Sequence, residues 1–310
     1  NRGTLALNNS TVNKNSSSLD GGGIYSINPD DPTDPNIVTL SKSTISGNSA
    51  GCGAGLYVDN STVTIENSTI SGNSAGRGAG LHVSGMYGVG QVILNNSTIS
   101  GNSATFDGGG IVVSGGAGAA VVRLNNTTVS ENLAGTSSGG IYLQEEFEVS
   151  ASIVILNSSI VSGNDAGGNF NELCNNDGNV TSESFNIFGH SGETSAQAFS
   201  GFTPGTSDVV ATSDGSAPAE LSAILSPLAD NGGLTQTHAL PAGSPAIDLD
   251  AACSTGLSTD QRGYARPAVS GTSCDAGAFE FGTVPTGVDD IDDRRSYLRQ
   301  TIFRIRGSTS

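Results

Sequence analysis

The side chains best able to do chemistry gather near the end of the chain. The candidates between positions 238 and 280 are one imidazole, four of the carboxylates and two guanidinium groups: His238, Asp248, Asp260, Arg262, Arg266, Asp275 and Glu280. A glycosidase needs two carboxyl groups about 5–9.5 Å apart, and a lyase needs a base and a cation that neutralises its substrate. The alternative role is structural, because loops without a strand ladder need internal polar bonds. We predict that Arg262 and Arg266 pair with Asp260 and Asp275, and that Asp248 caps a turn.

Three further residues with acid, base or cationic side chains stand in the repeated part of the chain, namely Glu66, His82 and Arg123. They fall at different levels of the repeat, so the spacing does not unite them in one site. His82 takes the place that Tyr57 and Tyr142 hold in other repeats, which indicates a substitution on the outer surface. We therefore predict that the protein is not an enzyme.

No metal or cofactor is expected, with calcium as the alternative. Oxygen donors in flexible loops suit Ca²⁺, and two acidic runs supply them without the spacing of a twelve-residue calcium loop: Asp20, Asp30, Asp31 and Asp34, then Asp289, Asp290, Asp292 and Asp293. Cys253 and Cys274 flank a compact loop and are predicted to form a disulfide, although four buried thiols remain the alternative. The states of Cys52 and Cys174 are left open.

The last segment, SYLRQTIFRIR (296–306), alternates as a strand does and is apolar on both faces. Five of the 12 basic residues follow Asp293, three of them in this segment, whereas all 29 acidic residues precede Arg294. An unpaired strand of this kind invites pairing, so we predict contacts between subunits by strand addition at the first coil. An intramolecular strap or the stub of an anchor is the alternative. The candidate contact residues are Tyr297, Leu298, Arg299, Ile302, Phe303, Arg304 and Ile305.

Charge and hydropathy exclude two classes of partner. The formal charge of −17 disfavours nucleic acid and anionic membrane surfaces. No apolar run approaches the roughly 18 residues that cross a bilayer. The chain opens inside a repeat without a signal peptide, which we interpret as a mature or trimmed product. A disulfide would suit an extracellular location.

A repeated phrase must position all these groups. An apolar residue, two small or polar residues and then Asn recur at intervals of 25 to 33 residues, a period typical of solenoids. The asparagines are Asn15, Asn48, Asn73, Asn102, Asn132 and Asn164. In stacked coils about 4.8 Å apart they are expected to form a hydrogen-bonded ladder. Short alternating runs such as Leu56–Val58 and Val63–Ile65 predict three strands per turn, and the longer units swell after the same strand, so insertions should cluster on one edge.

Two resemblances extend this interpretation. The ISGN and GGGIY phrases of residues 5–170 resemble the repeats of polymorphic outer membrane proteins, which implies a right-handed parallel β-helix outside a bacterial cell. Several later phrases, in order, resemble the end of bacterial surface proteins of the choice-of-anchor Q type: CNNDGNVTSESFNIFG (174–189), LADNGGLTQTHALPAGSPAID (228–248), TDQRGYARP (259–267) and CDAGAFEF (274–281). After Phe281 the sequence departs from that pattern, and the resemblance implies no reaction.

The sequence thus predicts an all-β fold, a right-handed parallel β-helix with a loop-rich C-terminal region and a strand-like tail. The expected domains are repeats over 1–170, a region over 171–282 that continues and caps the helix, and an acidic linker with a basic tail over 283–310. The predicted function is that of an extracellular structural or adhesive protein of a cell surface, which self-associates as an oligomer or filament. Binding or cleavage of polysaccharides, surface glycans included, is the alternative.

Overall fold

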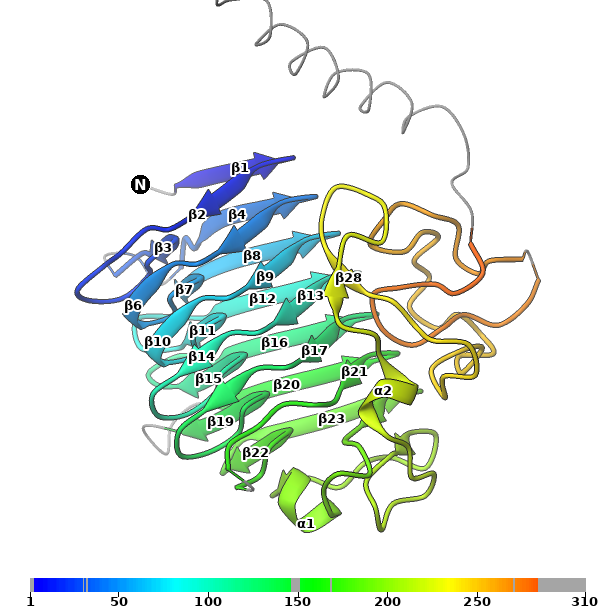
Figure 1. Cartoon of the computed structure of the whole chain (residues 1–310). Helices are drawn as coiled ribbons and strands as arrows, with labels where there is room; N and C mark the ends of the chain where they lie inside the picture. The colour runs from blue at the N-terminus through cyan, green and yellow to red at the C-terminus, as the bar shows by residue number, and fades with distance from the viewer. Residues whose placement is uncertain are drawn as a thin grey trace, which may run out of the picture.

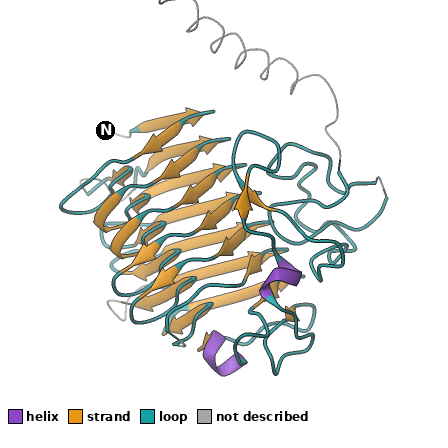
Figure 2. Ribbon diagram, viewed as in Figure 1, coloured by secondary structure: helices purple, strands orange, loops and turns teal. Residues whose placement is uncertain are grey.

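The computed structural model describes residues 3–29, 31, 33–145, 151–167, 169–269 and 271–283. These residues form a parallel β-solenoid whose coils are stacked along one axis, with a long segment folded against one side of the stack (Figure 1). Nearly all regular structure is strand, and two one-turn helices lie where the coils end (Figure 2). The predicted β-helix architecture is confirmed.

Four sheets surround the axis, named I to IV in chain order. Sheet I contains β1 (Thr4–Asn8), β4 (Asn36–Ser41), β8 (Ser61–Glu66), β12 (Gly90–Asn95), β16 (Ala120–Asn125), β20 (Ser152–Asn157) and β23 (Asn179–Ser184). Sheet II contains β2 (Thr11–Asn13), β5 (Thr44–Ser46), β9 (Thr69–Ser71), β13 (Thr98–Ser100), β17 (Thr128–Ser130), β21 (Ile160–Val161), β24 (Ile187–Phe188) and β26 (Val209–Val210).

Sheet III contains β6 (Ser49–Cys52), β10 (Ser74–Arg77), β14 (Ser103–Ala104) and β18 (Leu133–Ala134). Sheet IV contains β3 (Ile24–Ile27), β7 (Leu56–Asp59), β11 (Leu81–Ser84), β15 (Ile111–Gly115), β19 (Ile141–Glu145), β22 (Leu173–Asn176) and β25 (Phe199–Ser200). The central coils therefore have four strands rather than the predicted three. The sequence hides sheet III because its inward side chains are alanines, which leave no alternation of large apolar residues.

Like residues stack on like residues throughout the coils. Leu56 pairs with Leu81, which pairs with Ile111, and the same parallel register continues to the lower coils. These inward side chains are almost completely buried in one continuous core along the axis. Burial of apolar surface is the main stabilising contribution, since each fully buried Leu or Ile side chain contributes about 1.5–3 kcal/mol. An edge-to-face group of Phe188, Phe199 and Phe202 closes the lower end of this core.

The asparagine ladder runs along the corner between sheets II and III. Each member donates its backbone N–H and its Nδ2 to the Oδ1 of the next, as Asn73 does to Asn102 at 3.0 and 2.9 Å. The same Nδ2 also donates to a carbonyl of the coil above, so that Asn102 reaches the oxygen of Ile70 at 3.1 Å. The ladder begins at Asn15 and runs through all six predicted positions to Asn164. It holds the corner backbone where no strand ladder exists.

Corner insertions occupy the edge between sheets IV and I. They connect β3 to β4, β11 to β12, β15 to β16 and β19 to β20, which agrees with the prediction that they cluster on one edge. The opposite end of sheet I turns at asparagines with positive φ, among them Asn96 and Asn126. Both are buried, so these Asn-x-Thr/Ser sequences are corner residues rather than accessible glycosylation acceptors.

The C-terminal region differs from the expected cap. Residues 171–212 extend the solenoid by β22 to β26 and α1 (Ser195–Ala198). From α2 (Leu221–Ile224) onward the chain turns back along the outer face of sheet II and adds one short antiparallel pair, β27 (Leu228–Ala229) and β28 (Thr237–His238). This lateral segment, residues 221–283, covers the side of the stack instead of closing its end (Figure 1). The described residues contain no helix long and apolar enough to cross a membrane.

Candidate functional site

The lateral segment docks on rows of Thr and Ser side chains that the coils present outward from sheet II. Stacking aligns Thr69 with Thr98 and Thr128, and Ser71 with Ser100 and Ser130. Hydroxyl groups at these positions offer one donor and two acceptor sites each. Lateral residues use both, because Thr69 donates to the oxygen of Gln236 at 2.6 Å and the nitrogen of Ala278 donates to Thr128 at 3.1 Å.

Gln261 lies at the centre of this contact. Its Oε1 accepts from the hydroxyl of Thr98 at 2.7 Å, and its Nε2 donates to Thr69 and Thr235 at 2.9 and 2.8 Å. Only 2% of Gln261 is exposed, so every polar atom of its amide is satisfied inside the protein. This residue joins two coils to the lateral segment, and the sequence analysis did not single it out.

On either side of Gln261 in the sequence, the first predicted ion pair is present. Arg262 binds Asp260 at 2.6 Å, and Asp260 also accepts the backbone nitrogens of Arg262 and Tyr264. The guanidinium group lies between two aromatic rings, 3.6 Å from the centre of Phe279 and 4.4 Å from that of Tyr264. Because the carboxylate is completely buried and the guanidinium group makes cation–π contacts, this ion pair is part of the packed interior of the lateral segment.

The second predicted pair is different. Arg266 binds the carboxylate of Glu280 at 3.2 Å and donates to the backbone oxygens of Asp275 and Gly277 at 2.6 and 2.9 Å. The Asp275 carboxylate instead accepts the backbone nitrogens of Asp248 and Phe281. Burial raises the pKa of Glu280 to about 7, and the nearby Arg266 partly opposes that shift. The predicted pairing of Arg266 with the Asp275 carboxylate is wrong because turn geometry places backbone N–H groups there.

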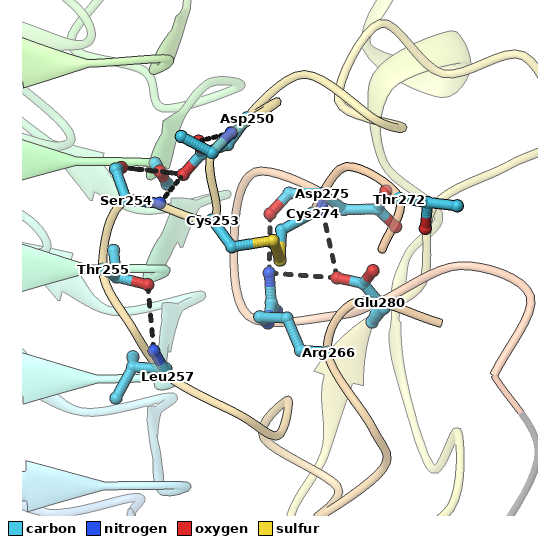
Figure 3. Close-up of a disulfide and its surroundings, with 12 residues drawn as sticks. Asp250, Cys253, Ser254, Thr255, Leu257, Arg266, Thr272, Cys274, Asp275 and Glu280 are labelled. Carbon is cyan, nitrogen blue, oxygen red and sulfur yellow. Dashed lines mark hydrogen bonds and ion pairs between the residues drawn. A yellow bond between two sulfur atoms is a disulfide. The ribbon is translucent and has the colours of Figure 1, made fainter. Parts of the chain in front are cut away.

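A disulfide joins Cys253 and Cys274, whose Cα atoms are 5.1 Å apart (Figure 3). Asp250 lies beside it, and its carboxylate accepts from the hydroxyls of Ser254 and of Ser158 in the coil, both at 2.7 Å. The disulfide therefore tightens a loop that is also tied to the solenoid. Cys52 and Cys174 are not part of a disulfide, and burial raises the pKa of Cys174 to about 11.

His238, the one imidazole of the cluster, is equally enclosed. Its Nε2 lies 2.9 Å from the hydroxyl of Ser100 and its Nδ1 lies 2.7 Å from the oxygen of Ser226. Burial lowers its pKa. Only 1% of the residue is exposed, so the ring bridges the coil and the lateral segment. The structure thus joins Asp260, Arg262, Arg266, Asp275 and Glu280 in an internal polar network. His238 is buried apart from them, and Asp248 is exposed.

A second region of interest lies on the outer face of sheet IV. The rings of Tyr25, Tyr57 and His82 stack in a column with centroids 5.4 and 5.1 Å apart. His82 is only 6% exposed, so its interpretation as a surface substitution is wrong. The glycine turns beside sheet IV cross over this row, and a Cβ at Gly78 would approach His82 to 3.0 Å. Burial lowers the pKa of His82 to about 4.

The lower end of the asparagine ladder holds two buried acids that the sequence analysis missed. Asn164 donates its Nδ2 to Glu172 at 2.6 Å, and Glu172 lies beside Glu193. Burial, followed by the charge of Glu193, raises the pKa of Glu172 well above its usual range. His190 is the neighbour of Glu193 on the outer side, with 3.7 Å between Nδ1 and Oε1. The only sequence signal for this contact was Glu172 itself, which follows the sixth asparagine of the ladder. Its carboxylate can accept the hydrogen bond that the amide of Asn164 donates.

Metal ligands do not gather in the part of the chain that the structure describes, where no group of three His, Cys, Asp or Glu residues could hold an ion. Asp20 accepts the backbone nitrogen of Cys52, and Asp31 accepts the hydroxyl and nitrogen of Thr33. Asp30 and the acids from Asp289 to Asp293 lie outside the described residues, as do all the candidate contact residues of the tail, 297–305. Calcium binding stays the untested alternative to the prediction of no metal.

Comparison with known proteins agrees with this geometry. The sequence model of the family described as right handed beta helix region matches residues 22–201, which is more than half of the chain. The protein belongs to the right-handed β-helix family. Searches of curated proteins and of solved structures gave no significant match. The family match ends before the lateral segment begins, so the resemblances to polymorphic outer membrane proteins and to choice-of-anchor Q proteins remain predictions for this β-helix protein.

Proposed function

We propose that this β-helix protein is a non-enzymatic structural or adhesive protein of a cell surface or secreted assembly. The observation that carries the proposal is the position of its ionisable cluster. Asp260, Arg266 and Glu280 are at most 5% exposed and bind one another or nearby backbone. A catalytic acid or base must come within hydrogen-bond reach of its substrate. The same groups, held inside, fix the lateral segment on the coils, and the disulfide supports an extracellular place.

The test is an activity screen combined with an adhesion assay. The purified chain is incubated with neutral and acidic polysaccharides, and reducing ends and unsaturated products are measured. We expect no turnover, and we expect retention on bacterial or host surface material. Turnover that disappears in an Asp260→Asn variant with an unchanged circular dichroism spectrum would overturn the proposal.

A second candidate function, binding of polysaccharides, is favoured by the aromatic column of sheet IV. Tyr25 is 52% exposed and Tyr87, in the adjacent corner insertion, is 44% exposed. Between them Asp59 accepts the nitrogen of Tyr87 at 3.1 Å. Asp59 is itself completely buried, so the exposed rings of Tyr25 and Tyr87 are the surfaces that would pack on a sugar ring. Pull-down on insoluble polysaccharides should weaken in Tyr25→Ala and Tyr87→Ala, but not in Phe106→Ala, an exposed aromatic on another corner.

Self-association through the tail is a separate part of the proposal. Its support is the sequence alone: a basic, strand-like segment that follows an acidic body. Truncation after Gly282 should lower the molar mass found by light scattering, and an unchanged assembly state would exclude this role for the tail.

A further inference from the structure

A pocket of about 360 Å³ opens where the lateral segment begins, beside the lower strands of sheet II. Ser130 from β17 and His190 from the last coil line one side, and Leu221 and Leu225 from α2 and its end line the other. Glu131 and Glu220 stand at its rim, both exposed. The pocket is separate from the internal cluster and from the aromatic column, and neither proposed function uses it.

The hydroxyl of Ser130 is the first sign that the pocket takes a ligand. Its neighbours in the stacked row are engaged, since Ser100 meets His238 at 2.9 Å and Ser162 donates to the oxygen of Gly189 at 2.8 Å. Ser130 is completely buried, lines the pocket, and its Oγ has no hydrogen-bond partner. Buried polar groups are nearly always paired, so a lone hydroxyl facing a cavity is a place for a ligand's polar group.

Besides its apolar side chains, the remaining wall carries two carboxylates, those of Glu131 and Glu220. The Oε1 atom of Glu193, whose side chain is 2% exposed, lies behind His190 without a hydrogen-bond partner. Glu220 lines the pocket and accepts one hydrogen bond, from Ser191 at 2.7 Å. No Lys or Arg lines the pocket. Leu221 and Leu225 give an apolar wall that would suit methylene groups.

We propose that this pocket binds an alkylguanidinium group, as carried by an arginine side chain. A guanidinium has five donors and no acceptor in a rigid plane, which complements two rim carboxylates and one unpaired hydroxyl. Its methylene stem lies along Leu221 and Leu225. The ligand is free arginine or an arginine on a peptide, because both present the same chemistry. The inference is independent of the proposed function.

Histidine signals provide the readout. The chain has three histidines, and His82 and His238 are buried, whereas His190 lines the pocket with a side chain 21% exposed. Titration with butylguanidinium, followed by ring carbon–proton correlation spectra, should move the His190 signals saturably. We expect a dissociation constant of about 1–10 mM, the scale for a small cation with few contacts. Butylamine should bind more weakly and butylurea, which is neutral, should not bind.

Variants locate the site. Glu131→Gln together with Glu220→Gln should weaken binding about tenfold, because charge-assisted hydrogen bonds are replaced by neutral ones. Ser130→Ala should weaken it by about threefold and leave the fold intact, since no partner is lost. Glu66→Gln, an acid that lines a different pocket, is the matched control. Unchanged His82 and His238 signals certify the fold of each variant.

Two outcomes would overturn the inference. His190 signals that stay still at about 50 mM butylguanidinium exclude a site of the expected affinity. Shifts that sodium chloride or butylurea reproduces, or that Glu66→Gln reduces as much as the rim variants do, would show unspecific screening. Comparison of arginine with an arginine-containing tripeptide separates the two sources: tighter binding of the tripeptide indicates a peptide ligand, and equal binding indicates the free amino acid.

Discussion

The coils and the lateral segment satisfy their backbones in opposite ways. In the coils, each strand pairs with equivalent strands above and below, and the corners are held by a repeated amide ladder. The lateral segment has a single two-residue strand pair and relies on buried charges, a disulfide and bonds to Thr and Ser of sheet II. A repeated backbone needs few charges, whereas an irregular one needs specific side chains at every turn. The coils and the lateral segment should therefore unfold in response to different substitutions.

The largest expected effect comes from interruption of the asparagine ladder. Asn102→Ala removes the acceptor of both donors of Asn73 and the donor to Ile70. We expect a loss of about 4 kcal/mol in the free energy of unfolding, since each orphaned buried group costs about 1–3 kcal/mol. Denaturant unfolding followed by circular dichroism measures it. Asn15→Ala, at the exposed top of the ladder, is the control and should cost less than about 1 kcal/mol.

Arg266→Met should damage the lateral segment alone. It leaves Glu280 and the oxygens of Asp275 and Gly277 without their donor, and the loss of one partner of a buried pair costs about 3–4 kcal/mol. Hydrogen exchange should rise over residues 246–281 and stay unchanged in the coils. Arg123→Met serves as the control, because its half-exposed pair with Glu183 contributes less than about 1 kcal/mol. Equal exchange in both regions would contradict independent failure.

Reduction of the disulfide tests the same difference with a smaller effect. Cys253 and Cys274 are 21 residues apart, and the chain-entropy relation gives about 3 kcal/mol for a loop of that length. Cys253→Ser with Cys274→Ser should therefore loosen the lateral segment, seen as faster proteolysis there, while coil resistance is kept. Cys52→Ser, at a cysteine of the coils that forms no disulfide, is the matched control. Proteolysis of the coils at the same rate would show that the regions unfold together.

The smallest effects concern pH, and they have opposite signs in the two regions. The pKa of His82 is lowered from 6.5 to about 4. Between these pH values the imidazole is protonated in the unfolded state and neutral in the folded state. The coils should lose about 2–3 kcal/mol as the pH falls from 6.5 to 4. The pKa of Glu280 is raised from 4.5 to about 7, so the folded state keeps a proton. The lateral segment should lose about 2–3 kcal/mol as the pH rises from 4.5 to 7.

His82→Gln and Glu280→Gln isolate these two contributions. His82→Gln should remove the loss of stability of the coils at low pH, and Glu280→Gln should remove the loss of stability of the lateral segment as the pH rises. Unfolding at constant ionic strength over a range of pH measures both. A Glu280→Gln profile that coincides with that of the unmodified protein would show that Arg266 keeps Glu280 ionised in the folded state.

The sequence by itself determined what repeats. The regular spacing of Asn48, Asn73 and Asn102 fixes the stacked coil, its amide ladder and the edge that takes the insertions, because in a solenoid the same side chain meets itself one turn later. The cysteine spacing likewise indicated the disulfide between Cys253 and Cys274. The sequence did not predict sheet III, because its inward residues are alanines and give no periodic pattern of large apolar side chains.

Only the tertiary structure decided what meets across non-repeating distances. Gln261 donates to Thr69, which is 192 residues away in the sequence. Arg266 pairs with the carboxylate of Glu280 and not with that of Asp275. His82 is buried under a turn that contains Gly78. The contact of Glu172 with Glu193 forms in the irregular last coils, and the pocket beside Ser130 forms only when the chain folds back on them. Such contacts depend on the path of an irregular backbone, which no periodicity encodes. The stacking of coils follows from a pattern that repeats along the sequence, whereas the docking of the lateral segment depends on contacts that occur once.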